Sequence, residues 1–262
     1  MNVFDETCNK LVLGGFVAAL IGLYFGTDVR FVNIVAALIA ASIAGAIWAY
    51  WPAVLRVKMG VSEVVTTLLS NYIIVNFTEY FVNYPLRSSG SSVPRADYIP
   101  DNFHFPNLSG GLSATIIVAI AAIILAELYR KYFVKGYQFR VTDGNELFAL
   151  QGGIDVDRVR IRSMLIGGAC AGLTGGLLVL SLNYTYEANF SADYGFIGLL
   201  VALIANNKPI AIFVITILFA ALQVGAIGMQ VFTSLPSEIT RVLQSTMVFI
   251  IAAQQFRNSR KG

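Results

Sequence analysis

The sequence predicts an all-α fold, a polytopic transmembrane helical bundle with about 7–8 membrane segments. The first observation behind this prediction is composition: 56% of the 262 residues are hydrophobic and 13% are charged, whereas soluble domains carry about 25% charged residues. The second is a series of apolar runs, several near the roughly 20 residues that span a bilayer as a helix. No polar stretch is long enough for a soluble domain, so we expect one transmembrane domain over residues 1–262.

The candidate spans follow one another with polar breaks between them. In order they are residues 11–26, 31–55, 62–84, 111–129, 163–183, 194–205, 209–227 and 237–256. The short run 194–205 ends at Asn206 and Asn207. A run of 10–14 apolar residues is more typical of a broken or re-entrant segment than of a full span. Non-helical backbone at that depth persists only against protein or a water-filled cavity, so Asn206 and Asn207 are candidates for lining a solute pathway.

Basic residues near the ends of the spans predict the orientation of the chain. They form three groups: Arg56 and Lys58; Arg130, Lys131, Lys135, Arg140, Arg158, Arg160 and Arg162; and Arg257, Arg260 and Lys261. All three groups lie on one side if the run 194–205 crosses the membrane. With that side as the cytosol, both termini are cytoplasmic and the polar loop 85–110 is extracytoplasmic.

Small residues recur at every fourth position in two of the spans. These residues are Ala37, Ala41 and Gly45 in the second span and Gly168, Gly172 and Gly176 in the fifth. Small residues on one helical face let backbones approach closely in lipid. We therefore expect both stripes to serve helix packing.

The residues that usually carry chemistry are scarce. Cys8 and Cys170 make no disulfide framework, and His104 is the single histidine. The sequence contains no G-x-x-x-x-G-K-[ST] loop for binding nucleotide phosphates. We expect no cofactor, no metal site and no enzymatic activity in this chain, and its net charge of +3 is not a nucleic-acid-binding signature.

Residues 141–155 read VTDGNELFALQGGID, a short amphipathic stretch between two basic clusters. Asp143 and Glu146 form a D-x-x-E pattern that can cap a helix reciprocally, and Gly152-Gly153 suit a left-handed stop. The apolar side chains between them are Leu147, Phe148 and Leu150. The expected two turns of helix are too short to be stable alone, so the helix docks either on its own bundle or on a partner.

The run from Asp143 to Ile154 resembles the G-x-N-x-x-A-A-x-x-x-G-I segment of the ABC importer permeases that serve ribose-type sugars, branched-chain amino acids and nucleosides. In that family the segment is similar to the coupling helix, which sits in a groove of the cytosolic ATPase. The resemblance implies a cytosolic coupling helix within 141–155. The residues expected to couple the chain to the ATPase are Asp143, Asn145, Glu146, Leu147, Phe148, Gly153 and Ile154.

Two further stretches are similar to the same family. Residues 58–73, KMGVSEVVTTLLSNYI, resemble the K-x-G-V-N-E-V-I-S-T-x-x-x-N-Y-I of its nucleoside-type members. Residues 195–209 resemble G-F-D-G-I-A-V-A-L-x-G-x-x-x-P, although Ile197 stands where the family has Asp. Family members usually carry further helices before this region. The chain is therefore either a shortened, divergent relative or lacks an upstream part.

The 58–73 stretch supplies two more pathway candidates. Glu63 lies at the cytosolic end of the third span, either as a gate residue or as an ion-pair partner of Arg56 or Lys58. Asn71 and Asn76 point about 140° apart on a helix. We expect Asn71 to face the translocation path, where its amide can bind a sugar or a base, and Asn76 to bond to a neighbouring helix.

The resemblance implies a multi-pass permease subunit of an ABC importer in the cell membrane, moving a nucleoside or, next, a simple sugar. The implied partners are cytosolic ABC ATPase subunits, a second permease in a homo- or heterodimer, an extracytoplasmic solute-binding protein and the lipid bilayer, with no nucleic acid. The alternative is an ion-coupled secondary transporter that uses Glu63 or Glu79 as a proton carrier. A membrane enzyme, or the coupling component of a vitamin importer, has less support in the sequence.

Overall fold

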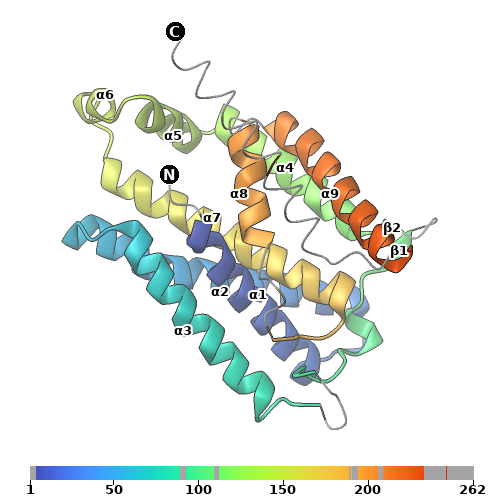
Figure 1. Cartoon of the computed structure of the whole chain (residues 1–262). Helices are drawn as coiled ribbons and strands as arrows, with labels where there is room; N and C mark the ends of the chain where they lie inside the picture. The colour runs from blue at the N-terminus through green and yellow to red at the C-terminus, as the bar shows by residue number, and fades with distance from the viewer. Residues whose placement is uncertain are drawn as a thin grey trace. The chain divides into compact units, whose positions relative to one another are not determined.

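The computed structural model describes residues 4–88, 93–108, 112–188, 190, 194–205, 209–232 and 246. The chain divides into two compact units, Met1–Gly195 and Phe196–Gly262. The helices of the first unit are α1 (Phe4–Tyr24), α2 (Arg30–Met59), α3 (Glu63–Asn83), α4 (Thr115–Tyr132), α5 (Val134–Gly144), α6 (Glu146–Gln151) and α7 (Val156–Leu178) (Figure 1). α7 continues into a π-helical turn, η2 (Val179–Asn183). Most residues of α8 (Tyr194–Ile204) and all of α9 (Pro209–Phe232) belong to the second unit.

The predicted helical class is confirmed, with one small addition. A 3-10 turn, η1 (Asp101–Phe103), and an antiparallel hairpin of two-residue strands, β1 (Asn107–Leu108) and β2 (Leu112–Ser113), follow α3. By length and composition, α2 and the continuous α7–η2 helix could cross a membrane. The short run predicted at 194–205 is the 11-residue helix α8. The last predicted span, 237–256, lies outside the described residues apart from position 246.

The core of the first unit is formed where α7 packs against α1 and α2 (Figure 1). A Cβ placed on Gly168 would lie 2.5 Å from the Cβ of Ala49 and 2.6 Å from the Gly45 carbonyl oxygen. Gly172 is in similar contact with the Ala41 carbonyl. The two stripes of small residues therefore pack against each other, which confirms their predicted role.

α3 packs on α1 mainly through aromatic side chains. The ring of Phe16 on α1 lies 5.7 Å from that of Phe81 and 6.4 Å from that of Phe77, both on α3. These edge-to-face pairs are a favoured aromatic geometry. They fix α3 beside α1 and leave its opposite side uncovered by the described part of the unit.

The segment 93–106 pairs with the chain that leaves α7. Ala96 N–H donates to the Tyr186 carbonyl and Ile99 N–H to the Tyr184 carbonyl, both at 2.9 Å. Within this segment, Phe103 is fully buried. Part of the loop predicted over 85–110, the 93–106 segment, is thus linked to the end of α7.

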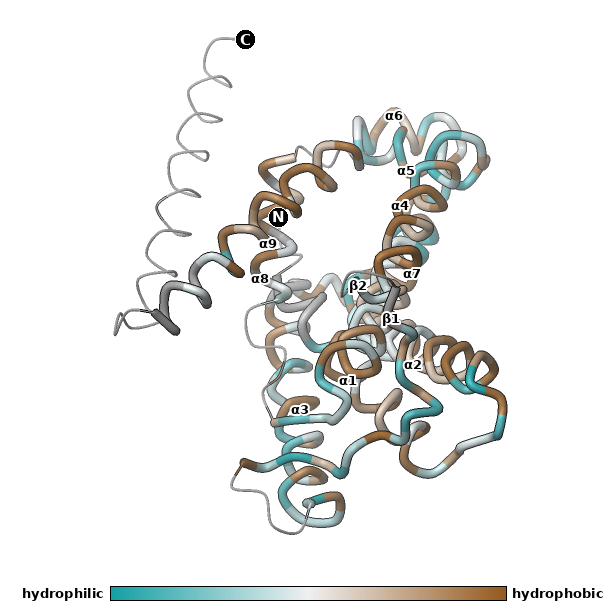
Figure 2. Tube along the Cα trace, turned by 90° about the vertical axis from the view of Figure 1, so that its right-hand side faces the viewer, coloured by the Kyte–Doolittle hydropathy of each residue, from teal (hydrophilic) through white to brown (hydrophobic). Residues whose placement is uncertain are grey.

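α4, α5 and α6 form an arm that returns to the start of α7. α4 has no buried residue, and its apolar surface gives way to a mixed, more polar one along α5 and α6 (Figure 2). A Cβ on Gly136 of α5 would lie 2.8 Å from the Cα of Arg130 on α4. This close contact sets the direction of α5 and hence the position of α6.

Candidate functional site

α6 is a six-residue helix whose own sequence closes both of its ends. At the N-cap, Asn145 has extended backbone (φ −157°, ψ 108°), and its side-chain oxygen accepts a hydrogen bond from Phe148 N–H at 3.1 Å. After the helix, Gly153 has φ +75°, the left-handed conformation that glycine adopts without steric cost. Ile154 N–H then donates to the Ala149 carbonyl at 3.0 Å. The predicted glycine stop is confirmed.

The capping pair predicted for this helix, Asp143 with Glu146, is wrong. α5 continues to Gly144, so Asp143 lies in the last turn of α5 and is not the N-cap of α6. The break between the two helices falls at Asn145, whose side-chain oxygen suits the N-cap position. Glu146 is free for another role, and its carboxylate accepts a hydrogen bond from the Arg160 guanidinium on α7 at 2.8 Å.

The same helix exposes three large apolar side chains. Leu147, Phe148 and Leu150 are 72%, 62% and 53% exposed, whereas Ala149 is fully buried. We call the three exposed side chains the α6 apolar surface. Contiguous apolar side chains next to an ion pair are typical of a protein-interaction site. α6 is therefore positioned by Ala149 and by the Glu146–Arg160 pair to present an apolar surface outwards.

Of the four predicted pathway residues, the structure describes the side chain of one. Asn71 is half-buried on α3, and its side-chain oxygen is enclosed without a hydrogen-bond donor from the described residues. Glu63 is the first residue of α3, but its side chain lies outside the described part. Asn206 and Asn207 lie outside the described residues. Of these four residues, the structure thus describes the surroundings of Asn71 alone.

A buried polar seam between α1 and α3 was not predicted from the sequence. Asn9 and Lys10 on α1 are 0% and 1% exposed. The Asn9 amide nitrogen donates to the Thr67 carbonyl on α3 at 3.5 Å. The other buried polar residues on this part of α3 are Thr66 and Ser70. Because Asn71 lies one turn beyond Thr67, its enclosed amide oxygen extends the seam along α3.

The seam was missed because the first span was expected to begin at residue 11. α1 begins at Phe4, so Asn9 and Lys10 lie within the helix and not before it. A useful signal was present on α3, where Thr67 and Asn71 are four residues apart and so share a face. No comparable spacing on α1 indicated that Lys10 would be buried.

Asn76 also differs from its prediction. It is exposed, and its amide nitrogen donates at 2.7 Å to the Tyr72 carbonyl of its own helix, not to a neighbouring one. The reason is its place on α3: Ile74 and Thr78 face the bundle and are buried, which turns Asn76 away from it.

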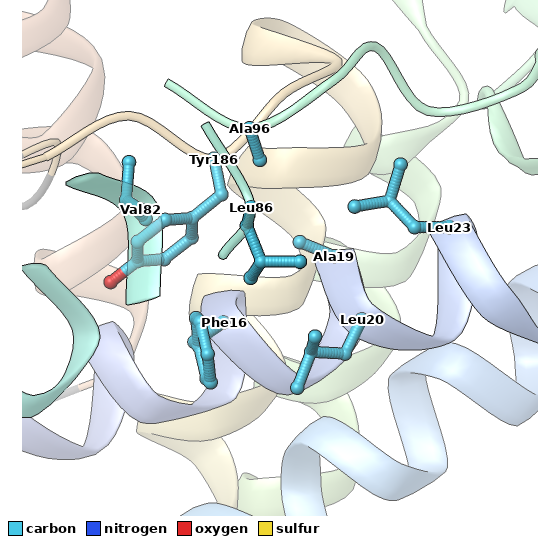
Figure 3. Close-up of a pocket in the computed structure, with 8 residues that line it drawn as sticks. All are labelled: Phe16, Ala19, Leu20, Leu23, Val82, Leu86, Ala96 and Tyr186. Carbon is cyan, nitrogen blue, oxygen red and sulfur yellow. The ribbon is translucent and has the colours of Figure 1, made fainter. Parts of the chain in front are cut away.

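The 93–106 segment closes over a narrow apolar crevice between α1 and α3 (Figure 3). Its lining residues are Phe16, Ala19, Leu20, Leu23, Val82, Leu86, Ala96 and Tyr186. It has no space for a water molecule, so it is a packing contact. Burial raises the pKa of the Tyr186 hydroxyl above its usual range, and the hydrogen bond with Thr78 acts in the opposite direction. Tyr186 thus links the 93–106 segment to α3 in its neutral form.

Within the described ranges, no group of three or more His, Cys, Asp and Glu side chains could hold a metal ion. The features with a possible function are therefore α6, the buried polar seam and the uncovered side of α3.

Comparison with known proteins points to one family. A family model described as "Branched-chain amino acid transport system / permease component" matches residues 9–252. The nucleoside ABC transporter permease protein of Lactococcus lactis is 30% identical, over 97% of this chain and 73% of its own length. No solved structure matches the chain.

Two further relatives have related names. The guanosine ABC transporter permease protein of Bacillus subtilis is 26% identical, over 93% of this chain and 71% of its own length. The glucose ABC transporter permease protein of Haloferax volcanii is 27% identical, over 86% of this chain and 62% of its own length. The chain therefore spans between 62% and 73% of the length of these three relatives.

Proposed function

Because the chain belongs to the family of permease components of branched-chain amino acid transport systems, we propose that it is the membrane-spanning permease subunit of an ATP-binding-cassette importer. Its solute is small and polar, a nucleoside first and a simple sugar next. The names of the nucleoside, guanosine and glucose permeases support this choice. ATP hydrolysis belongs to a partner chain, and this chain makes and breaks no covalent bond.

The observation that carries the proposal is the α6 apolar surface. α6 is capped at both ends and linked to α7 by the Glu146–Arg160 ion pair, yet Leu147, Phe148 and Leu150 are exposed. A helix built in this way can enter a groove on a cytosolic ATPase and transmit a movement of the ATPase to α7. In this proposal the contact extends from Asp143 to Ile154, as the resemblance implies.

The same proposal fixes the orientation and the partners. The chain crosses the membrane about 7–8 times, with 141–155 and both termini in the cytosol and 85–110 outside. Basic residues support this: Arg130 and Lys131 end α4 and Arg158 begins α7, as expected for cytosolic span ends. The partners are ATPase subunits, a second permease and an extracytoplasmic solute-binding protein.

The test is the double substitution Glu146→Arg with Phe148→Asp. It removes the ion pair with Arg160 and places a charge in the α6 apolar surface, so the ATPase should no longer co-purify with the permease from detergent-solubilised membranes. The permease itself should stay in the membrane at a normal level, because both side chains are exposed or half-exposed.

A matched control is Asp97→Arg with Tyr98→Asp. It introduces the same two residue types, Arg and Asp, at two exposed positions of the 93–106 segment. ATPase co-purification should be retained. ATPase binding that survives the α6 double substitution would overturn the coupling assignment.

A further inference from the structure

α3 has two sides of different chemistry. The side that faces the bundle carries Thr67, Ile74, Thr78 and Val82, all at most 2% exposed. The opposite side carries Tyr72, Asn76, Glu79, Tyr80 and Asn83, which we call the α3 polar face, and the exposed apolar side chains of Ile73 and Phe77 lie beside it. Tyr72, Asn76 and Tyr80 are exposed, and Glu79 and Asn83 are half-buried. Their spacing of three to four residues places them on one side of a helix.

The two side-chain amides of this face form hydrogen bonds with carbonyls of α3 itself. The amide nitrogens of Asn76 and Asn83 donate to the carbonyls of Tyr72 and Glu79, at 2.7 and 2.8 Å, within α3 itself. Among the described residues, no basic side chain lies within ion-pair distance of the Glu79 carboxylate. The Glu79 carboxylate is half-buried near the Tyr186 hydroxyl, and the rings of Tyr72 and Tyr80 are 66% and 59% exposed.

Comparison with α2 shows that the α3 polar face does not suit lipid. The exposed stripe of α2 consists of Ile39, Ile43 and Ile47 at the same four-residue spacing, and such a surface matches hydrocarbon. A carboxylate in a membrane segment is costly there and normally faces the bundle interior or a water-filled cavity. The Asn76 and Glu79 side chains therefore require a polar environment, in contrast to the exposed isoleucines of α2.

We propose that the α3 polar face lines the solute pathway and contacts a neutral, ring-bearing polyol such as a nucleoside. This inference rests on the proposed transport function and names the surface that recognises the solute. Tyr72 and Tyr80 offer ring faces on which a base can stack. Asn76 and Glu79 offer oxygens that accept hydrogen bonds from hydroxyl and N–H groups.

The charge and spacing of the face add to this assignment. Glu79 repels an anionic solute, and the described part of the face offers the carboxylate of an amino acid no cation. Eight residues of helix rise about 12 Å, so Tyr72 and Tyr80 contact a nucleoside one after the other. Successive contacts along one helix are the arrangement of a pathway and not of a single closed pocket.

The first experiment measures water access. Single-cysteine variants Asn76→Cys and Tyr80→Cys are made in the full chain with Cys8→Ser and Cys170→Ser, and they are expressed with the partner subunits. The matched control is Ile43→Cys on the exposed stripe of α2. A membrane-impermeant methanethiosulfonate should label positions 76 and 80 at least about tenfold faster than position 43, and guanosine should slow that labelling.

Two results of this experiment overturn the inference. Labelling at 76 and 80 that is no faster than at 43 would mean that the face meets lipid. An intermolecular disulfide between the Asn76→Cys residues of two copies would mean that it is an interface between permeases.

The second experiment separates this inference from the proposed function. Uptake of radiolabelled guanosine by the complete transporter is compared for wild type, Tyr80→Ala and Tyr80→Phe, with ATPase co-purification as the assembly check. Tyr80→Ala should lower uptake about fivefold or more, and Tyr80→Phe should restore it because the ring is kept. Wild type without uptake of guanosine or glucose would contradict the proposed function. Active wild type with an equally active Tyr80→Ala would contradict only the role of α3.

Discussion

The α2–α7 contact is formed by small residues, whereas the α6 apolar surface consists of large side chains. Where α7 crosses α2, Gly168 has no room for a methyl group against Ala49 and Gly45. On α6, by contrast, Leu147 and Phe148 are large, apolar and exposed. The first region is closed by residues of this chain, whereas in the function proposed above the second is covered by a partner ATPase. The proposed function therefore assigns the first region to holding the fold and the second to receiving force from the ATPase.

α7 belongs to both regions. Its first turns carry Arg160, which pairs with Glu146 of α6, and its later turns carry the glycines that pack on α2. A helix that is packed without gaps moves as a rigid rod, because a close-packed interior transmits displacement. A displacement of α6 is therefore expected to be transmitted along α7 to the glycines that pack on α2.

The largest expected effect separates two neighbouring glycines of α7. Gly168→Leu forces a side chain into Ala49 and Gly45 and should destabilise the protein by about 3 kcal/mol. Gly167 has no atom within 4 Å of a Cβ placed on it, so Gly167→Leu should change stability little. Thermal unfolding of the detergent-solubilised chain, followed by size-exclusion chromatography, measures both. Equal losses in the two variants would contradict the close α2–α7 contact.

A smaller effect tests how α6 is capped. Asn145→Ala removes the oxygen that accepts the Phe148 N–H hydrogen bond and should cost the helix about 1 kcal/mol. Amide hydrogen exchange at Leu147 and Phe148 should then become several times faster. Asp143→Ala is the control, because Asp143 lies in α5 and should leave that exchange unchanged. Faster exchange in Asp143→Ala alone would restore the capping predicted from the sequence.

The smallest effect concerns the link between α6 and α7. The Glu146 and Arg160 side chains are 48% and 40% exposed, so solvent screens the pair and its coupling energy should be about 0.5 kcal/mol. A double-mutant cycle with Glu146→Ala and Arg160→Ala, read out as thermal stability, measures it. The coupling should shrink as salt is added. A salt-independent value well above 1 kcal/mol would show that the pair is a main support of the fold.

The sequence predicted best where a residue type permits a single structural role. Stripes of glycine and alanine at four-residue spacing have no large side chain to bury, so close helix packing was the natural prediction for Gly168 and Gly172. Likewise, Gly152-Gly153 after a short apolar run indicated the left-handed end of α6. Both predictions depend on local steric limits that the sequence itself contains.

Predictions failed where a neighbouring element decides the outcome. Asp143 is a good N-cap residue, but α5, which packs against α4 at Gly136, continues past Asp143 to Gly144. Lys10 is buried because α1 begins earlier than its apolar run. The exposure of Asn76 likewise depends on which side of α3 meets α1. Each of these outcomes is set by tertiary contacts, which spacing along one segment does not encode.

The 93–106 segment links the end of α7 to the beginning of α2. The Arg30 guanidinium at the start of α2 donates to the His104 carbonyl at 2.8 Å, and Ile99 N–H donates to the Tyr184 carbonyl that follows α7. The two helices are thus linked to each other at one end through these hydrogen bonds. A load applied to α6 acts on the opposite end of α7. We expect it to change the angle between α2 and α7 about the end at which the two helices are linked.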